Sequence, residues 1–217
     1  LEINIQNVKF SKNSFKNNLT NNNGRLDYDG KFKKAQKFKF SKIRKFGEFE
    51  PEIAIDKNSL IFFSNKGSIL KFDDKSELIW KKNYYSKQEK KLKPNLFLAK
   101  DDKTLIVADN VAKIYALDIN TGELKWQKNN TSAFNSEIKI YKDYFFLIDY
   151  QNILRCFSVK DGKEIWKMKT ENSILKSEKK LSLVIKDNKI FFNNSIGDII
   201  ASDVATGNLL WIVPTLK

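Results

Sequence analysis

The stretch IYALDINTGELKW, residues Ile114–Trp126, decides the fold. Its first half alternates as a half-buried strand does, and we expect that strand to span Lys113–Ile119. A turn with the sequence NTG follows, and a second strand, Leu124–Lys128, leaves it. Glycine supplies the positive φ that tight hairpin turns need, and an aspartate before the turn can accept backbone N–H bonds. The stretch therefore predicts a β-hairpin whose second strand carries a tryptophan.

The same hairpin recurs along the chain in phase with every tryptophan. Two further copies read LRCFSVKDGKEIW (Leu154–Trp166) and IIASDVATGNLLW (Ile199–Trp211), and a first copy, ILKFDDKSELIW (Ile69–Trp80), is one residue shorter at the turn. The tryptophans are 46, 40 and 45 residues apart. A fixed period of this length is the signature of a repeat architecture. The residues that we assign to the structural repeat are Trp80, Trp126, Trp166, Trp211, Gly122, Gly162, Gly207, Asp118 and Asp203.

Each hairpin is preceded by two more short runs rich in Ile, Phe, Val and Tyr, separated by turn-forming residues. We expect these strands at Glu52–Ile55, Leu60–Ser64, Leu96–Ala99, Thr104–Asp109, Glu137–Tyr141, Tyr144–Asp149, Leu181–Ile185 and Lys189–Asn193. Four strands per repeat predict one four-stranded antiparallel sheet each, and hence an all-β fold, a β-propeller with a tryptophan between neighbouring blades. The alternative is a pair of stacked β-sandwiches, whose turns have no reason to recur in phase with tryptophan.

The predicted blades cover residues 51–217, at about 51–93, 94–133, 134–176 and 177–217. Residues 1–50 form a separate N-terminal segment, which we interpret as a degenerate or partial blade because Phe38 stands where the period places a tryptophan. The expected architecture is therefore a partial or half ring of about four to five blades.

The pattern A-x-D-x-x-T-G-x-x-x-W, at Ala116–Trp126 and Ala201–Trp211, resembles the PQQ-like repeat, also called the tryptophan-docking motif. Within these repeats, the run from Phe49 to Trp211 is most similar to the BamB family of outer-membrane-protein assembly factors. The resemblance implies an eight-bladed propeller, for which 217 residues are too few. We expect a fragment, a half ring that pairs with another copy, or a smaller ring.

Composition removes several classes of enzyme. The chain has no His and one Cys, which excludes His-based triads, His-ligated zinc and disulfide redox chemistry. Cys156 stands at the position of the repeat alanines and reads as a small core residue. No apolar run is long enough to span a membrane. We therefore expect no enzyme, no cofactor and no metal site.

The net charge of +14 suggests an anionic partner, but lysine is abundant everywhere and arginine occurs only at Arg25, Arg44 and Arg155. A lysine-rich composition is thus the main interpretation of the charge. The connection Asn83–Pro94, NYYSKQEKKLKP, mixes tyrosine with lysine and is suited to an acidic surface or a phosphate, or is a solvated loop.

A second irregular connection, Thr170–Lys180, carries apolar residues beside charged ones. Its similarity to BamB-like proteins implies a contact with the barrel subunit of the outer-membrane assembly machinery. The predicted partner-binding residues are Ile174, Leu175, Lys176, Ser177 and Glu178. A contrary interpretation is that the two apolar side chains pack into a blade.

The resemblance thus implies a non-catalytic periplasmic scaffold at the outer membrane, attached only through a lipid anchor that this sequence does not contain. Open blade edges also favour self-association. The alternatives are a fragment of a quinoprotein, PQQ-dependent, oxidoreductase and a basic module that binds nucleic acid or another polyanion. For the scaffold itself we expect no specific nucleic acid as a partner.

Overall fold

In the computed structural model, residues 52–171 and 179–215 are described, and they form four antiparallel sheets of four strands each. Blade 1 contains β1 (Ala54–Asp56), β2 (Ser59–Phe63), β3 (Ile69–Phe72) and β4 (Leu78–Lys82). Blade 2 contains β5 (Leu96–Lys100), β6 (Thr104–Asp109), β7 (Lys113–Asp118) and β8 (Leu124–Asn129). Blade 3 contains β9 (Lys139–Tyr141), β10 (Tyr144–Ile148), β11 (Ile153–Ser158) and β12 (Glu164–Lys169). Blade 4 contains β13 (Leu183–Lys186), β14 (Lys189–Asn193), β15 (Ile199–Asp203) and β16 (Leu209–Val213).

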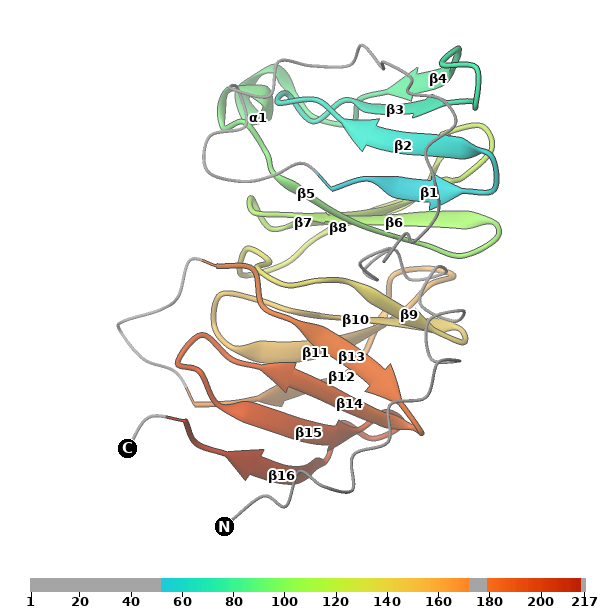
Figure 1. Cartoon of the computed structure of the whole chain (residues 1–217). Helices are drawn as coiled ribbons and strands as arrows, with labels where there is room; N and C mark the ends of the chain where they lie inside the picture. Colours follow the sequence, from blue (N-terminus) through green and yellow to red (C-terminus); the bar gives the residue numbers. More distant parts are fainter. Residues whose placement is uncertain (1–51, 172–178, 216–217) are drawn as a thin grey trace, which may run out of the picture.

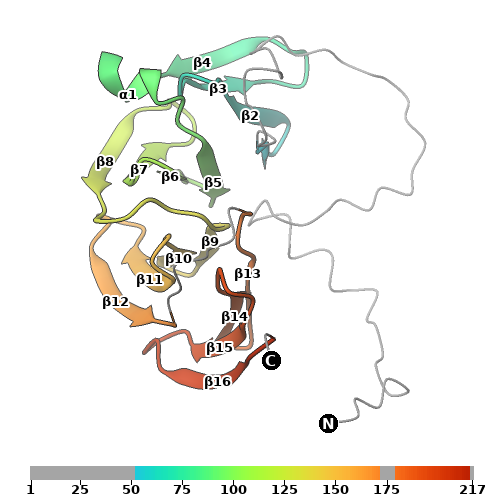
Figure 2. The ribbon, with the colours of Figure 1, turned by 90° about the vertical axis from the view of Figure 1, so that its left-hand side faces the viewer.

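The four blades follow one another along an open arc, from blade 1 at one end to blade 4 at the other (Figures 1 and 2). In Figure 2 the strands β5, β9 and β13 lie on the concave side and β8 and β12 on the convex side. The predicted all-β propeller architecture is confirmed, and the alternative of stacked sandwiches is wrong. The predicted N-terminal segment 1–50 lies outside the described residues.

The hydrophobic core is divided among the contacts between blades. One buried cluster joins blades 1 and 2, a second joins blades 2 and 3, and a third joins blades 3 and 4. The middle strands are covered on both faces, so β6 is buried along its whole length, whereas the outer strand β8 is largely exposed. This explains why β6 reads as a continuous apolar run. The alternating sequence of β7 predicts a half-buried strand, but Lys113–Leu117 are all buried because this strand too is covered on both faces.

All four blades have a β-bulge at the same place in their strand pairing. In every blade the third and fourth strands shift register once, at Lys71/Phe72, Ala116/Leu117, Cys156/Phe157 and Ala201/Ser202. A bulge increases the local twist of a hairpin. The bulge therefore lies at the same place in each blade, next to the residue that pairs with the tryptophan.

The connection Asn83–Pro94 contains a short helix, α1 (Lys87–Lys91), which the periodicity of the sequence did not predict. Ser86 caps it by accepting from the backbone N–H of Glu89, and the Glu89 side chain accepts from the backbone N–H of Ser86. This reciprocal capping box is the sequence signal that was available for the helix.

Candidate partner-binding surface

The tryptophans join each blade to the next through a backbone carbonyl and a glycine. The indole N–H groups of Trp80, Trp126 and Trp166 donate to the carbonyls of Ile119, Val159 and Val204, at 3.2, 2.9 and 3.1 Å. A Cβ added to Gly122, Gly162 or Gly207 would come within 2.5–2.7 Å of the corresponding ring. The fourth tryptophan, Trp211, is 43% exposed on the free face of blade 4.

Aspartates fix the turns that carry these glycines. The Oδ1 atom of Asp118 accepts from the backbone N–H groups of Asn120 and Thr121, at 2.9 and 3.1 Å. The equivalent atom of Asp203 accepts from the backbone N–H groups of Ala205 and Thr206. The bond from Thr121 holds the pKa of the Asp118 carboxyl below its ordinary value. These aspartates therefore stabilise the turns that place the glycines against the tryptophans.

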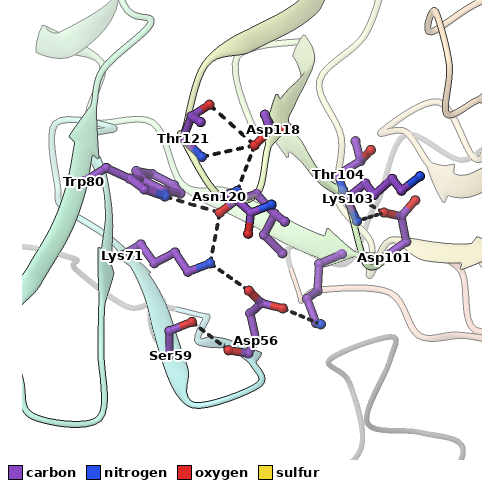
Figure 3. Close-up of polar contacts among 12 residues, drawn as sticks. Asp56, Ser59, Lys71, Trp80, Asp101, Lys103, Thr104, Asp118, Asn120 and Thr121 are labelled. Atoms are coloured by element: carbon purple, nitrogen blue, oxygen red, sulfur yellow. Dashed lines mark hydrogen bonds and ion pairs between the residues drawn. The ribbon is translucent and has the colours of Figure 1, made fainter.

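A buried ion cluster joins blades 1 and 2 (Figure 3). The Asp56 carboxylate accepts from Lys71 Nζ at 2.7 Å and from Lys100 Nζ at 2.9 Å, with all three side chains at most 10% exposed. Lys71 Nζ also donates to the Ile119 carbonyl that receives the Trp80 indole. Burial raises the pKa of Asp56, but the two lysine hydrogen bonds outweigh it, and the net shift is downward. The cluster is paired throughout, so its role is to fix blade against blade.

The predicted partner-binding residues Ile174, Leu175, Lys176, Ser177 and Glu178 lie in the segment 172–178, outside the described residues. The structure does describe both ends of the connection that carries them. These ends leave blade 3 after β12 and enter blade 4 before β13, and asparagines of blade 3 hold both of them.

Asn152 holds the first end. It is fully buried with φ +57°, and its Nδ2 donates to the Glu171 carbonyl at 2.8 Å. Its own carbonyl accepts from the backbone N–H of Thr170 at 3.1 Å, and its Oδ1 accepts from the backbone N–H of Ser195 in blade 4. One side chain thus ties the start of the connection to two blades.

Asn135 and Glu52 hold the second end. Asn135 Nδ2 donates to the Lys179 carbonyl at 3.2 Å, and the Asn135 carbonyl accepts from Leu181 N–H at 2.8 Å. Lys180 Nζ donates to the carboxylate of Glu52, whose other oxygen accepts from Leu98 N–H in blade 2. Lys180, three residues before β13, is therefore paired with Glu52, two residues before β1.

Sequence reasoning did not identify Asn152, Asn135 or Glu52 as supports of the connection. An asparagine in a turn is a weak signal for αL backbone, which Asn152 has, but no pattern in the sequence indicates which carbonyl its amide reaches. The Glu52–Lys180 pair joins residues 128 positions apart.

The one cysteine of the chain is a core residue, as its place in the repeat predicts. Cys156 is buried, and burial raises the pKa of its thiol to about 12, so it is not a thiolate at neutral pH. Among the described residues, no three His, Cys, Asp or Glu side chains gather in a way that suits a metal ion. The same part of the chain has no helix long and apolar enough to cross a membrane.

Comparison with known proteins agrees with this architecture. The sequence profile of the family described as outer membrane protein assembly factor BamB matches residues 65–217. No curated protein matches the chain.

Three solved structures share the arrangement of blades. BamB from Moraxella catarrhalis is 20% identical with a TM-score of 0.57, over 76% of this chain and 52% of that one. The quinohemoprotein alcohol dehydrogenase ADHIIG from Pseudomonas putida HK5 is 13% identical with a TM-score of 0.60, over 76% and 34%. The computationally designed protein Ika4 is 12% identical with a TM-score of 0.56, over 78% and 99%. These likenesses show a common fold, and the chain spans about half the length of the BamB structure.

Proposed function

The chain belongs to the family of the outer membrane protein assembly factor BamB, and from this premise we propose that it is a non-catalytic, protein-binding propeller scaffold. In this proposal it acts in the periplasm, at the outer membrane, as an accessory factor in the assembly of β-barrel proteins. Its partner is the barrel subunit of the assembly machinery.

The main observation in favour of the proposal is that side chains of the blades bind the residues on both sides of the segment 172–178. Buried asparagines and one ion pair hold both of its ends on the blades, so a binding segment here starts and finishes at fixed points. Fixing the ends of a loop reduces the conformational entropy that a partner must remove on binding. The sequence of the segment supplies Ile174 and Leu175 beside Lys176 and Glu178, a combination of apolar and charged groups suited to a protein interface.

The experiment is capture of the barrel subunit by the immobilised chain, with wild type and Leu175→Asp compared. We expect the variant to lose affinity by about tenfold or more, as an apolar anchor of an interface does. Leu78→Asp is the matched control, because Leu78 is 51% exposed on β4 of blade 1, far along the arc. Equal capture by wild type and Leu175→Asp would count against the proposal.

A further inference from the structure

The helix α1 carries several lysines and a single acidic residue. Lys87, Lys90 and Lys91 lie on it, and Lys93 follows it. The one carboxylate of the segment, Glu89, is turned toward blade 2, where its Oε1 is 2.6 Å from Lys113 Nζ. Its Oε2 accepts from the backbone N–H of Ser86. The negative charge of Glu89 is therefore already compensated, whereas the lysines of α1 have no carboxylate partner among residues 52–171 and 179–215.

A paired network in blade 2 holds α1 in place. The ammonium of Lys113 lies 4.6 Å from the centre of the Tyr85 ring, and the Tyr85 hydroxyl donates to Asp109. The neighbouring Tyr84 hydroxyl donates to the Gly122 carbonyl. Tyr85 is buried, so the residues that lead into α1 belong to the core between blades 1 and 2. The lysines of α1 are therefore carried by an anchored element, not by a free loop.

A fifth lysine, Lys66, comes from the turn after β2 in blade 1. A Cβ on Gly67 would lie 2.4 Å from the Tyr85 ring and 3.0 Å from Pro94 Cγ, so the turn after β2 packs directly against the segment that carries α1. Asn83 Nδ2 secures this approach by donating to the Lys66 carbonyl at 3.0 Å and to Ser68 Oγ at 2.8 Å.

The turn after β2 and the segment of α1 together line an open depression of about 400 Å³. Figures 1 and 2 show α1 at the end of blade 1. Its lining is formed by Asn65, Lys66, Lys87, Lys90, Lys91 and Lys93. None of the five lysines forms an ion pair with any carboxylate of residues 52–171 and 179–215. Five like charges around one depression repel one another and attract a compact anion of multiple charge.

We propose that this depression is a binding site for phosphate groups, independent of the protein-binding role above. Lysine ammonium groups act as point charges toward phosphate, and several converging on one depression match the charge of a diphosphate or of clustered phospholipid headgroups. A ligand with a single carboxylate is a poorer match than a phosphate group, because one negative charge balances only one of the five lysines. Free phosphates and lipid headgroups share this chemistry, and the experiment separates them.

The test uses two variants of the full chain with the same change in net charge. The pocket variant combines Lys66→Gln, Lys90→Gln, Lys91→Gln and Lys93→Gln. The control variant combines Lys75→Gln, Lys160→Gln, Lys186→Gln and Lys189→Gln, at lysines that are exposed and outside the depression. Circular dichroism and thermal unfolding establish that both variants fold. Binding is measured to pyrophosphate by calorimetry and to phosphatidylglycerol–phosphatidylcholine vesicles by cosedimentation.

We expect the pocket variant to bind at least about tenfold more weakly than the control, since each lysine near an anionic surface contributes measurably. A loss confined to vesicles assigns the site to lipid headgroups, and a loss with pyrophosphate as well shows that a free phosphate suffices. Equal losses in both variants would show that only net charge matters and would overturn the proposal. Absence of binding by the wild type to either probe would overturn it too.

Discussion

At the scale of residues, neighbouring blades meet at a glycine and a tryptophan. Gly162 has φ +65°, and a Cβ there would lie 2.6 Å from the ring of Trp126. Both the backbone conformation and the space require glycine, because an L side chain is strained at this φ and no atom fits against the ring.

We therefore predict that Gly162→Ala lowers the free energy of unfolding by about 2–4 kcal/mol, from backbone strain and overpacking together. The measurement is denaturant unfolding followed by tryptophan fluorescence. Gly197→Ala is the control, because Gly197 also has positive φ, but a Cβ there would approach only the hydroxyl of Thr215. A loss in Gly162→Ala no larger than that in Gly197→Ala would show that the tryptophan contact adds nothing.

The residue scale also shows what a sequence can and cannot reveal. The spacing of Gly122 before Trp126 is periodic, so the repeat was visible without a structure. Ser76 departs from the pattern and still has the positive φ of the repeat glycines, at +69°. The pairing of Asp56 with Lys71 and Lys100 could not be predicted, because the charges come from three strands up to 44 positions apart.

At the scale of elements, the strands were predictable and the helix was not. The predicted strand Thr104–Asp109 coincides with β6, because short apolar runs between turn residues suit buried strands. Helix α1 has five residues, too few for a period of 3.6 to show. It is held by its capping box and by the contact of Glu89 with Lys113. The hydrogen bonds that hold the residues flanking 172–178 could not be predicted either, because they join side-chain amides to carbonyls that are distant in the sequence.

Helix α1 gives the protein a stability that depends on pH. The hydrogen bond from Lys113, with help from the backbone of Ser86, lowers the pKa of Glu89 from 4.5 to about 2. Because the pKa of Glu89 is lower in the folded chain than in the unfolded chain, its ionised form stabilises the fold. This stabilisation is fully present at pH values above the unfolded pKa of 4.5, and it is lost as the pH falls toward the folded pKa of about 2. We expect Glu89→Gln to cost about 1 kcal/mol or less near neutral pH, since the side chain is a third exposed.

The pH-dependent contribution of Glu89 is measured by urea unfolding of wild type and Glu89→Gln at a series of pH values. The difference in free energy of unfolding should be constant above about pH 5.5 and shrink steadily below pH 4. Exposed Glu77 in blade 1 supplies the control Glu77→Gln. A difference that stays constant down to pH 3 would contradict the assigned role of Glu89.

At the scale of the whole molecule, the four blades form an arc, and we propose two binding regions on it. One is the segment 172–178, whose described ends leave blade 3 and enter blade 4, and the other is the lysine-lined depression beside blade 1. We propose that the first binds protein and the second phosphate. Variants of one surface should therefore leave binding at the other unchanged, because their ligands share no contacts.

We propose above that the connection 172–178 binds the barrel subunit of the assembly machinery. Amide hydrogen exchange of the chain, measured with and without that subunit, is the direct test. We expect slower exchange on binding across residues 172–178, with no change in the Asn83–Pro94 connection. Protection that appears elsewhere on the blades while residues 172–178 exchange as fast as in the free chain would contradict it.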